Sequence, residues 1–300
     1  MKAATNGAIL RRVTGKSTGL KRHAFAHPGS TILRVLVYGA GILTAALCLF
    51  LVGTVLVRGI PALKPSLFAF TSNSETLSML PSIFNTLEMI FLTLLIALPV
   101  GLGTAVYLTE YASRASRLVS LLRMAVETLQ GLPSVLFGLF GYLLFVTAFG
   151  WGYSMMAGVL TLVLIILPVL IRTAEEAILS VPDSYREGSY ALGAGRLRTV
   201  FRVILPAALP GILGGVVLSV GRIVGETAAL IFTAGTAVSY FTGDVMGAGR
   251  TLAVHLYALW NEGLSTSEAY ATAVILLVFA VVINALSEYL TGKLRKRYAE

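Results

Sequence analysis

Two charged residues, Arg222 and Glu226, lie inside an otherwise apolar stretch that covers about residues 208–232. In a helix, residues four apart share one face with their side chains about 6 Å apart. Arginine suits an anion, because its planar guanidinium can donate two hydrogen bonds to one oxyanion. Glu226 would hold that side chain ready and prevent tight trapping of the anion. The alternative is that Glu226 only neutralises Arg222 and that the pair locks helices together.

Residues that could catalyse a reaction or hold a metal do not come together in the sequence. The single cysteine, Cys48, lies in an apolar run, and the three histidines are scattered. Paired carboxylates and a Ser/His/Asp arrangement are not recognisable. A Gly15-Lys16-Ser17 run lacks the glycine that a nucleotide-binding loop needs five positions earlier. We therefore expect no enzyme activity, no catalytic residue, no metal and no cofactor.

A polar stretch at residues 187–206 interrupts the apolar part of the chain. Glu187 begins a run of small residues, and Gly193 breaks the helical pattern because glycine tolerates unusual backbone angles. A basic amphipathic segment follows, and Leu205-Pro206 closes it, where proline can start a new helix. The stretch predicts a helix, a glycine bend and a second helix at a membrane surface, suited to docking into a groove on a soluble partner.

The composition indicates a membrane protein. Of 300 residues, 56% are hydrophobic and only 12% are charged, whereas about a quarter are charged in soluble domains. Apolar runs of roughly the 20 residues that span a bilayer recur along the chain. They cover about residues 35–57, 83–109, 124–149, 155–171, 208–232 and 267–290. The predicted fold is all-α and polytopic, with six transmembrane helices.

Small residues predict where these helices pack closely. Gly211 and Gly215 are four apart, and so are Gly221 and Gly225. Glycines at this spacing let two helices approach each other. We therefore expect the fifth span to be a packing element in the middle of the bundle.

The basic residues predict the orientation. Nineteen of the 23 fall in four segments that would share one side: the first 34 residues, 110–123, 172–207 and the C-terminal end. Arg58, Lys64 and Arg250 would lie on the other side. The positive-inside rule then puts both termini and the polar stretch in the cytoplasm, next to anionic lipid. Because the basic residues are spread over separate segments, we expect no nucleic-acid partner.

Glu187, Gly193 and Leu205-Pro206 resemble the EAA loop of binding-protein-dependent ABC importer permeases. That signature is Glu-Ala-Ala, three residues, Gly, nine residues, then Ile-x-Leu-Pro. Here a Gly-Ser pair stands where alanines are usual, and valine replaces isoleucine. The resemblance implies that these four residues couple the chain to an ATPase.

Three further stretches resemble phosphate importer permeases. They are residues 127–141 (ETLQGLPSVLFGLFG), residues 221–227 (GRIVGET) and residues 108–112 (LTEYA). The last is closer to the PstA-type subunit than to its sister, the PstC-type subunit. The resemblance covers roughly residues 80–290 and leaves out the basic N-terminal tail.

The resemblance implies a membrane permease subunit of an ATP-driven importer, which moves inorganic phosphate into the cytoplasm. It also implies a paired sister permease, an ABC ATPase dimer at the cytoplasmic face and an extracytoplasmic phosphate-binding protein. ATP hydrolysis would belong to the ATPase. Other readings are a PstC-type permease, a permease for another oxyanion such as phosphonate or sulfate, and a scaffold subunit that transports nothing.

The expected organisation has four parts. A basic cytoplasmic tail (1–34) precedes the first transmembrane helix and an external loop (35–79). The permease domain (80–290) contains the coupling loop (183–206), and a short cytoplasmic tail (291–300) ends the chain. The expected location is the cell inner membrane, with Arg222 and Glu226 as the candidate residues of the substrate pathway.

Overall fold

The computed structural model describes residues 28–69, 78–113, 116–237, 244–263 and 265–298, and every regular element among them is helical. Residues 1–27 of the expected N-terminal tail lie outside the described residues. The chain divides into two units, residues 1–54 and 55–300.

Helix α2 (Pro28–Gly59) provides the first candidate span. It begins before the apolar run, and the stretch Ile32–Ala62 is long and apolar enough to cross a membrane. Two short 3₁₀ turns, η1 (Ile60–Ala62) and η2 (Pro65–Phe68), follow it.

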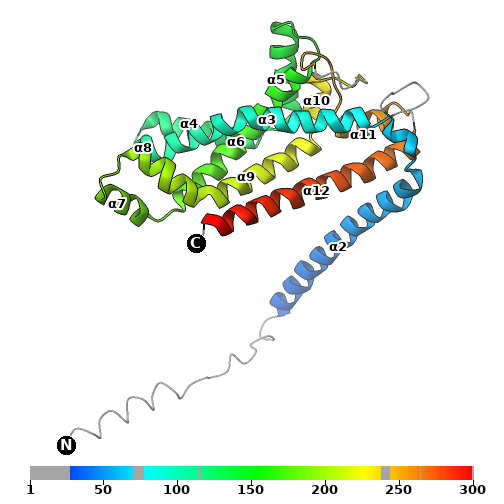
Figure 1. The fold of residues 1–300 in the computed structure, drawn as a ribbon. Coiled ribbons are helices and arrows are strands. Elements are labelled where there is room, and N and C mark those ends of the chain that lie inside the picture. Colours follow the sequence, from blue (N-terminus) through cyan, green and yellow to red (C-terminus); the bar gives the residue numbers. More distant parts are fainter. Residues whose placement is uncertain (1–27, 70–77, 114–115, 238–243, 264, 299–300) are drawn as a thin grey trace, which may run out of the picture. The chain divides into compact units, whose positions relative to one another are not determined.

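Four long helices form the body of the second unit: α3 (Leu80–Val106), α6 (Met155–Leu179), α9 (Leu205–Gly225) and α12 (Thr266–Tyr298). Helix α6 packs between α3 and α9, and α9 packs against α12 (Figure 1). Side chains of α6 such as Leu162 and Ile166 are fully buried in the main core. Helix α12 continues through most of the expected C-terminal tail.

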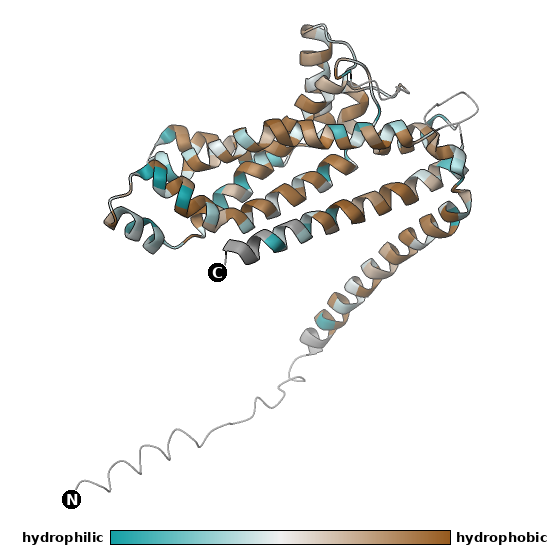
Figure 2. Cartoon of the chain, in the orientation of Figure 1, coloured by the Kyte–Doolittle hydropathy of each residue, from teal (hydrophilic) through white to brown (hydrophobic). Residues whose placement is uncertain are grey.

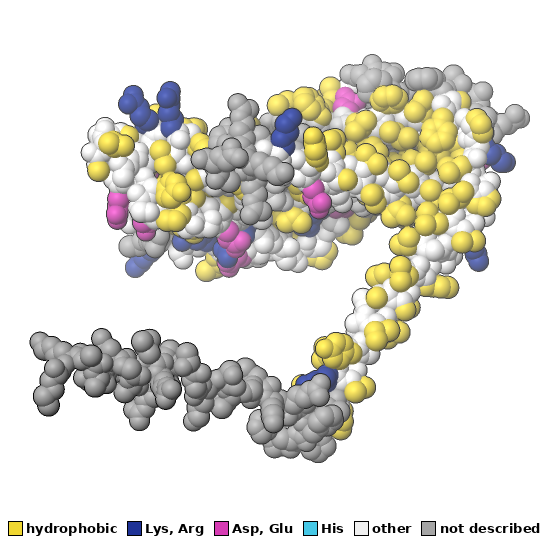
Figure 3. Space-filling view, turned by 60° about the horizontal axis from the view of Figure 1, so that its bottom comes forward, with side chains coloured by type: hydrophobic (Ala, Val, Ile, Leu, Met, Phe, Trp, Pro, Cys, Tyr) yellow, Lys and Arg dark blue, Asp and Glu magenta, His cyan; other side chains and the backbone are white. Residues whose placement is uncertain are grey.

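The surface of this unit is also apolar. The long helices are hydrophobic along most of their length (Figure 2), and hydrophobic side chains cover much of the face seen in Figure 3. Large contiguous apolar surfaces are rare on soluble monomers and mark contact with a membrane or a protein. The all-α, multi-pass membrane architecture expected from the sequence is confirmed.

The third predicted span, about residues 124–149, corresponds to a sharply bent pair of helices that begins earlier, at Arg117. Helix α4 (Arg117–Gln130) is followed by Gly131 as its C-cap, and α5 (Ser134–Gly141) with the π-helical turn η4 (Tyr142–Ala148) continues at an angle of 104°. Pro133 explains the break, since it has no backbone donor and disfavours helical angles at the residue before it. Five helices of the described residues are long and apolar enough to span a membrane, or six if this bent pair is one span.

The fifth predicted span is also broken. Helix α9 ends at Gly225, Glu226 has extended backbone angles, and the short helix α10 (Ala228–Thr233) follows. Among the described residues between α10 and α12, helix α11 spans Leu252–Asn261.

The two glycine pairs of α9 behave differently. A Cβ at Gly211 would lie 2.6 Å from the Ala177 Cβ, and one at Gly215 would clash with Thr173, so this pair allows close packing on α6 as expected. At Gly225 a Cβ would meet nothing within 4 Å, and at Gly221 only one atom at 3.8 Å. The second pair therefore needs no glycine for packing among the described residues.

Orientation can be tested by labelling. In a variant with Cys48 replaced by alanine, single cysteines at Ser66 and Glu262 should react with an impermeant thiol reagent added outside the cell. Cysteines at Ser184 and Lys293 should react only after the membrane is opened. All four side chains are exposed at the surface of the described chain, so their reactivity reports the side of the membrane on which they lie. The reverse pattern would contradict the orientation inferred from the basic residues.

Candidate functional site: the coupling segment and a charged helix end

The polar stretch forms the expected helix–bend–helix, at one end of the helical body (Figure 1). Helix α7 (Asp183–Ala191) ends where Gly193, with φ +79°, donates its N–H to the Tyr190 carbonyl at 2.9 Å. A left-handed glycine just past a helix is a standard way to satisfy its last carbonyls. The short helix α8 (Arg196–Thr199) follows. We call residues 183–206 the coupling segment.

The coupling segment presents apolar side chains to its surroundings. Leu192 at the bend is 90% exposed, and Leu197 and Phe201 are also exposed. Beside them lies a groove of ≈440 Å³ lined by residues that include Tyr185, Leu192 and Val203. Glu187 is exposed and makes no ion pair among the described residues. Such exposed apolar groups favour contact with another protein.

Leu205-Pro206 does not start a separate helix, contrary to the sequence-based expectation. The π-helical turn η5 (Val200–Ile204) joins α8 directly to α9, so helix runs without a break from Arg196 to Gly225. Leu205 and Pro206 are the first two residues of α9, and both are half-buried. A π turn commonly marks a functional site within a helix.

One arginine that the sequence analysis overlooked anchors the coupling segment to the body. Arg186 Nη2 lies 2.7 Å from Glu110 Oε1, and its Nε donates to the same oxygen at 3.0 Å. The guanidinium also donates to the carbonyls of Ile178 and Val181. The Glu110 side chain is only 5% exposed, at the end of the π-helical turn η3 (Tyr107–Tyr111) that follows α3. The partners lie 76 residues apart, so no local pattern predicts the pair.

A second ion pair holds the bent span. Arg123 of α4 lies 2.7 Å from Glu175 of α6, whose side chain is 6% exposed. Gln130, at the end of α4, donates to the Pro168 carbonyl of α6 at 2.9 Å. Helix α6 is therefore tied to the bent span near the coupling segment.

The Gly193 bend leads to a prediction. Gly193→Val should place a β-branched residue at φ +79° and strain the bend by about 1–3 kcal/mol. Association with the ATPase should fall while membrane insertion survives, as measured by copurification from membranes. Gly195→Val is the matched control, because Gly195 has φ −74° and open space around its Cβ position. Equal copurification of the ATPase with the two variants would show that the bend at Gly193 is not needed for ATPase association.

Arg222 and Glu226 do not form the expected ion pair. Because α9 ends at Gly225, the two residues do not share a helical face, and no salt bridge joins them among the described residues. Glu226 is 8% exposed, and its Oε1 accepts the N–H of Ala229 at 3.2 Å in the first turn of α10. Arg222 is half-buried in the last turn of α9, with no hydrogen bond in the described part of the chain.

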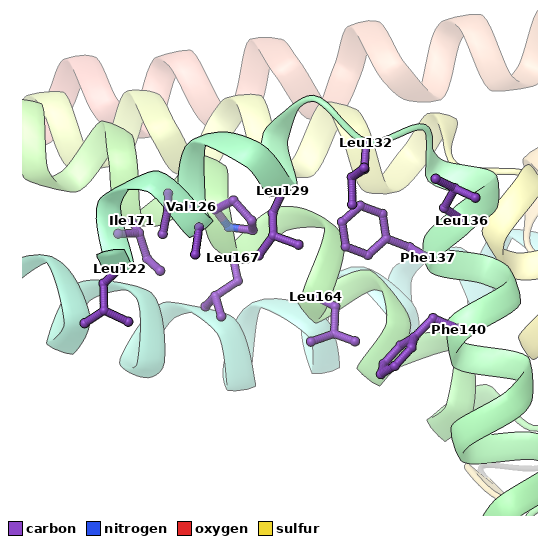
Figure 4. Close-up of a pocket in the computed structure, with 12 residues that line it drawn as sticks. Leu122, Val126, Leu129, Leu132, Leu136, Phe137, Phe140, Leu164, Leu167 and Ile171 are labelled. Carbon is purple, nitrogen blue, oxygen red and sulfur yellow. The ribbon is translucent and has the colours of Figure 1, made fainter. Parts of the chain in front are cut away.

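A cavity beside the bent span lacks the chemistry for an anion. It has a volume of ≈490 Å³ and lies between α4, α5 and α6. Leu122, Val126, Leu129, Phe137 and Leu167 are among its lining side chains (Figure 4), and all twelve lining residues are apolar. Within the described residues, no three His, Cys, Asp or Glu side chains are grouped to hold a metal.

A multi-pass helical body with an exposed helix–bend–helix at one end is the architecture of this chain. The chain belongs to the family of binding-protein-dependent transport system inner membrane components, whose family model matches residues 97–296. It is therefore a membrane transport subunit and not an enzyme in its own right.

Relatives with curated names agree with this family. The chain is 34% identical over 280 residues to the probable ABC transporter permease protein YqgI of Bacillus subtilis, covering 86% of this chain and 94% of that protein. It is 36% identical over 206 residues to the phosphate transport system permease protein PstA 1 of Mycobacterium tuberculosis, covering 68% and 67%.

Solved structures share the fold. A bacterial ABC transporter that imports the acidic polysaccharide alginate superimposes with a TM-score of 0.63 at 17% identity, covering 88% of this chain and 98% of that chain. The MetNI methionine ABC transporter superimposes with a TM-score of 0.59 at 21% identity, covering 75% and 99%.

Proposed function

We propose that this chain is a permease subunit of an ATP-driven importer that carries inorganic phosphate into the cytoplasm. The observation that supports phosphate as the substrate is the 36% identity with a PstA protein over 206 residues. The stretch Gly221–Thr227, which resembles a phosphate-permease signature, supports it. The name of the YqgI relative states no substrate, so phosphate rests on the PstA relatives and on these residues.

The proposed complex contains a paired sister permease, an ABC ATPase dimer and an extracytoplasmic phosphate-binding protein, in the inner membrane. The ATPase docks on the cytoplasmic coupling segment, where exposed Leu192 and Leu197 offer an apolar contact. Glu187, Gly193, Leu205 and Pro206 serve this coupling. When the ATPase moves the coupling segment, the ion pair Arg186–Glu110 transmits this movement to α3.

Arg222 and Glu226 are the proposed residues of the substrate pathway. Arg222 attracts the phosphate oxyanion with its two-pronged donor group. Glu226 keeps the start of α10 in place through its hydrogen bond to Ala229. This differs from the sequence-based hypothesis, in which Glu226 held the arginine directly.

Uptake of radiolabelled phosphate into proteoliposomes tests the proposal. The chain is co-expressed with an ABC ATPase, a second permease and an extracytoplasmic phosphate-binding protein, and phosphate uptake is compared with that of labelled phosphonate and sulfate. ATP-dependent phosphate uptake supports the proposal. Uptake of sulfate or phosphonate but not phosphate would show that the substrate is another oxyanion. A complex that assembles without transporting any of these anions would favour a scaffold role.

A PstC-type identity remains the alternative within phosphate import. If the paired sister permease resembles PstA more closely than this chain does, this chain takes the PstC-type role in the complex. The coupling segment and the pathway residues keep their proposed roles in either case.

A further inference from the structure

Arg250 is a buried cation whose guanidinium forms no ion pair with any residue that the structure describes. It is 3% exposed, and its Nε and Nη2 are fully enclosed with no hydrogen-bond partner among the described residues. No carboxylate of the described residues lies within 4.0 Å of it. Burial lowers its pKa, while the charge of Glu262 opposes this shift. Because a buried charge without a hydrogen-bonded partner is strongly unfavourable, such a group favours the binding of an anion.

His255 adds a second unsatisfied group close by. It is completely buried, and neither ring nitrogen has a hydrogen-bond partner in the described part of the chain. Burial, and then the positive charge of Arg250, lower the pKa of His255 to about 3. The imidazole is therefore neutral at physiological pH, and one nitrogen donates while the other accepts.

The protein holds this pair in a defined place. The Arg250 carbonyl accepts from Asn85 Nδ2 of α3 at 3.2 Å, and the Leu252 N–H donates to Thr86 Oγ1 at 2.9 Å. Gly249 lies tightly against Met155 at the start of α6. His255 is the fourth residue of α11, and the Thr251 side chain caps this helix by accepting the Val254 N–H.

Arg250 and His255 lie outside the candidate spans. Helix α11, which contains His255 and begins two residues after Arg250, lies at the end of the helical body opposite α7 and α8 (Figure 1). The distribution of basic residues predicts that this end is external. An anion that enters from outside would therefore meet Arg250 at the start of its path.

We propose that Arg250 and His255 form an oxyanion site at this end of the permease, selective for an oxyanion that carries a proton. This rests on the proposed phosphate transport and adds to it a second binding step, separate from Arg222. Arg250 supplies the positive charge and donates to two oxygens. One nitrogen of His255 donates to a further oxygen.

The accepting nitrogen of His255 is the source of selectivity. Hydrogen phosphate has an O–H that can donate to it, whereas sulfate has none at neutral pH. Bound sulfate would leave that buried nitrogen unpaired, which is costly. In this structure both side chains are closed off from solvent, so the site fills when the transport cycle opens this end.

Thermal unfolding of the purified complex in detergent tests binding directly. Inorganic phosphate should raise the unfolding temperature of the wild type more than sulfate or chloride at the same ionic strength, since a ligand of the folded state stabilises it. Arg250→Met and His255→Leu should lose the difference between phosphate and sulfate. His255→Gln should keep part of it, because an amide retains one donor and one acceptor.

Phosphate uptake gives the second readout. Arg250→Met should lower uptake about 10- to 100-fold, as expected from losing hydrogen bonds to a charged group. Arg58→Met is the matched control, because Arg58 is an exposed arginine beside Tyr270 at the same end. Its uptake should stay near that of the wild type. Should Arg250→Met not assemble, Arg250→Lys keeps the charge without the fork and should still lose most of the uptake.

The outcomes separate this site from the proposed function. A wild-type complex that takes up no phosphate overturns the proposed function. A wild type that imports phosphate, together with Arg250 and His255 variants that import it equally well and keep the phosphate-specific stabilisation, overturns the site alone.

Discussion

Arg186→Ala is expected to uncouple the permease from its ATPase and to destabilise the fold. It removes the partner of Glu110, whose side chain is 5% exposed, and frees the carbonyls of Ile178 and Val181. Removing one member of a buried ion pair typically costs about 3–5 kcal/mol, because the other charge is left unpaired. Thermal unfolding and copurification of the ATPase should both show the loss.

The exposed pair Arg172–Glu176 provides the matched control. Its Nε–Oε1 distance is also 2.7 Å, but the side chains are 42% and 60% exposed. Exposed pairs contribute only about 0–1 kcal/mol, so Arg172→Ala should change stability little. Arg186→Ala behaving like Arg172→Ala would show that the buried pair does not anchor the coupling segment.

A double variant separates charge from packing at this anchor. Arg186→Met with Glu110→Leu removes both charges and keeps apolar bulk, which is often tolerated at buried pairs. We expect stability to recover relative to Arg186→Ala, while ATP-dependent uptake stays low because the hydrogen bonds to Ile178 and Val181 are absent. Full recovery of uptake would mean that the anchor serves stability alone.

The charge-swapped variant Arg222→Glu with Glu226→Arg is expected to lose phosphate uptake as completely as Arg222→Met. The two residues form no ion pair, so exchanging them restores no interaction. An arginine at position 226 also cannot accept the Ala229 N–H that Glu226 accepts at 3.2 Å. Uptake in proteoliposomes should fall about tenfold or more, the effect of losing a charge-assisted hydrogen bond to the anion.

Conservative variants distinguish the proposed binding of the anion by Arg222 from the hydrogen bond that Glu226 accepts at the start of α10. Glu226→Gln retains an oxygen that can accept from Ala229, so the complex should assemble and keep its ATPase activity. Arg222→Lys keeps the charge but loses the planar guanidinium, so its phosphate uptake should lie between that of Arg222→Met and that of the wild type. Near-normal uptake by the charge-swapped variant would exclude a position-specific role for Arg222.

Local sequence determined the parts of this protein that depend on neighbours along the chain. Apolar runs of about 20 residues are sufficient to predict helices that cross a membrane, since a bilayer leaves backbone groups no other partners. The helix–bend–helix was equally predictable, because only glycine readily adopts the positive φ of Gly193. Family membership followed from the same local spacing of Glu187, Gly193 and Leu205-Pro206.

Tertiary structure decided where the helices break and which charges meet. The sequence contained Pro133, yet the 104° bend also involves contacts of α4 with α6, such as that from Gln130 to Pro168. Arg222 and Glu226 have the spacing of a helical pair but are separated by the end of α9.

Pairing across long stretches of chain lies outside what local spacing can predict. Arg186 meets Glu110 from 76 residues away, and Arg250 is held by Asn85 from 165 residues away. Whether a charge is buried, paired or left for a ligand depends on what the packed helices bring around it, because burial removes the water that would otherwise solvate it. The physical reason is that electrostatic partners are selected by three-dimensional packing and not by position in the chain.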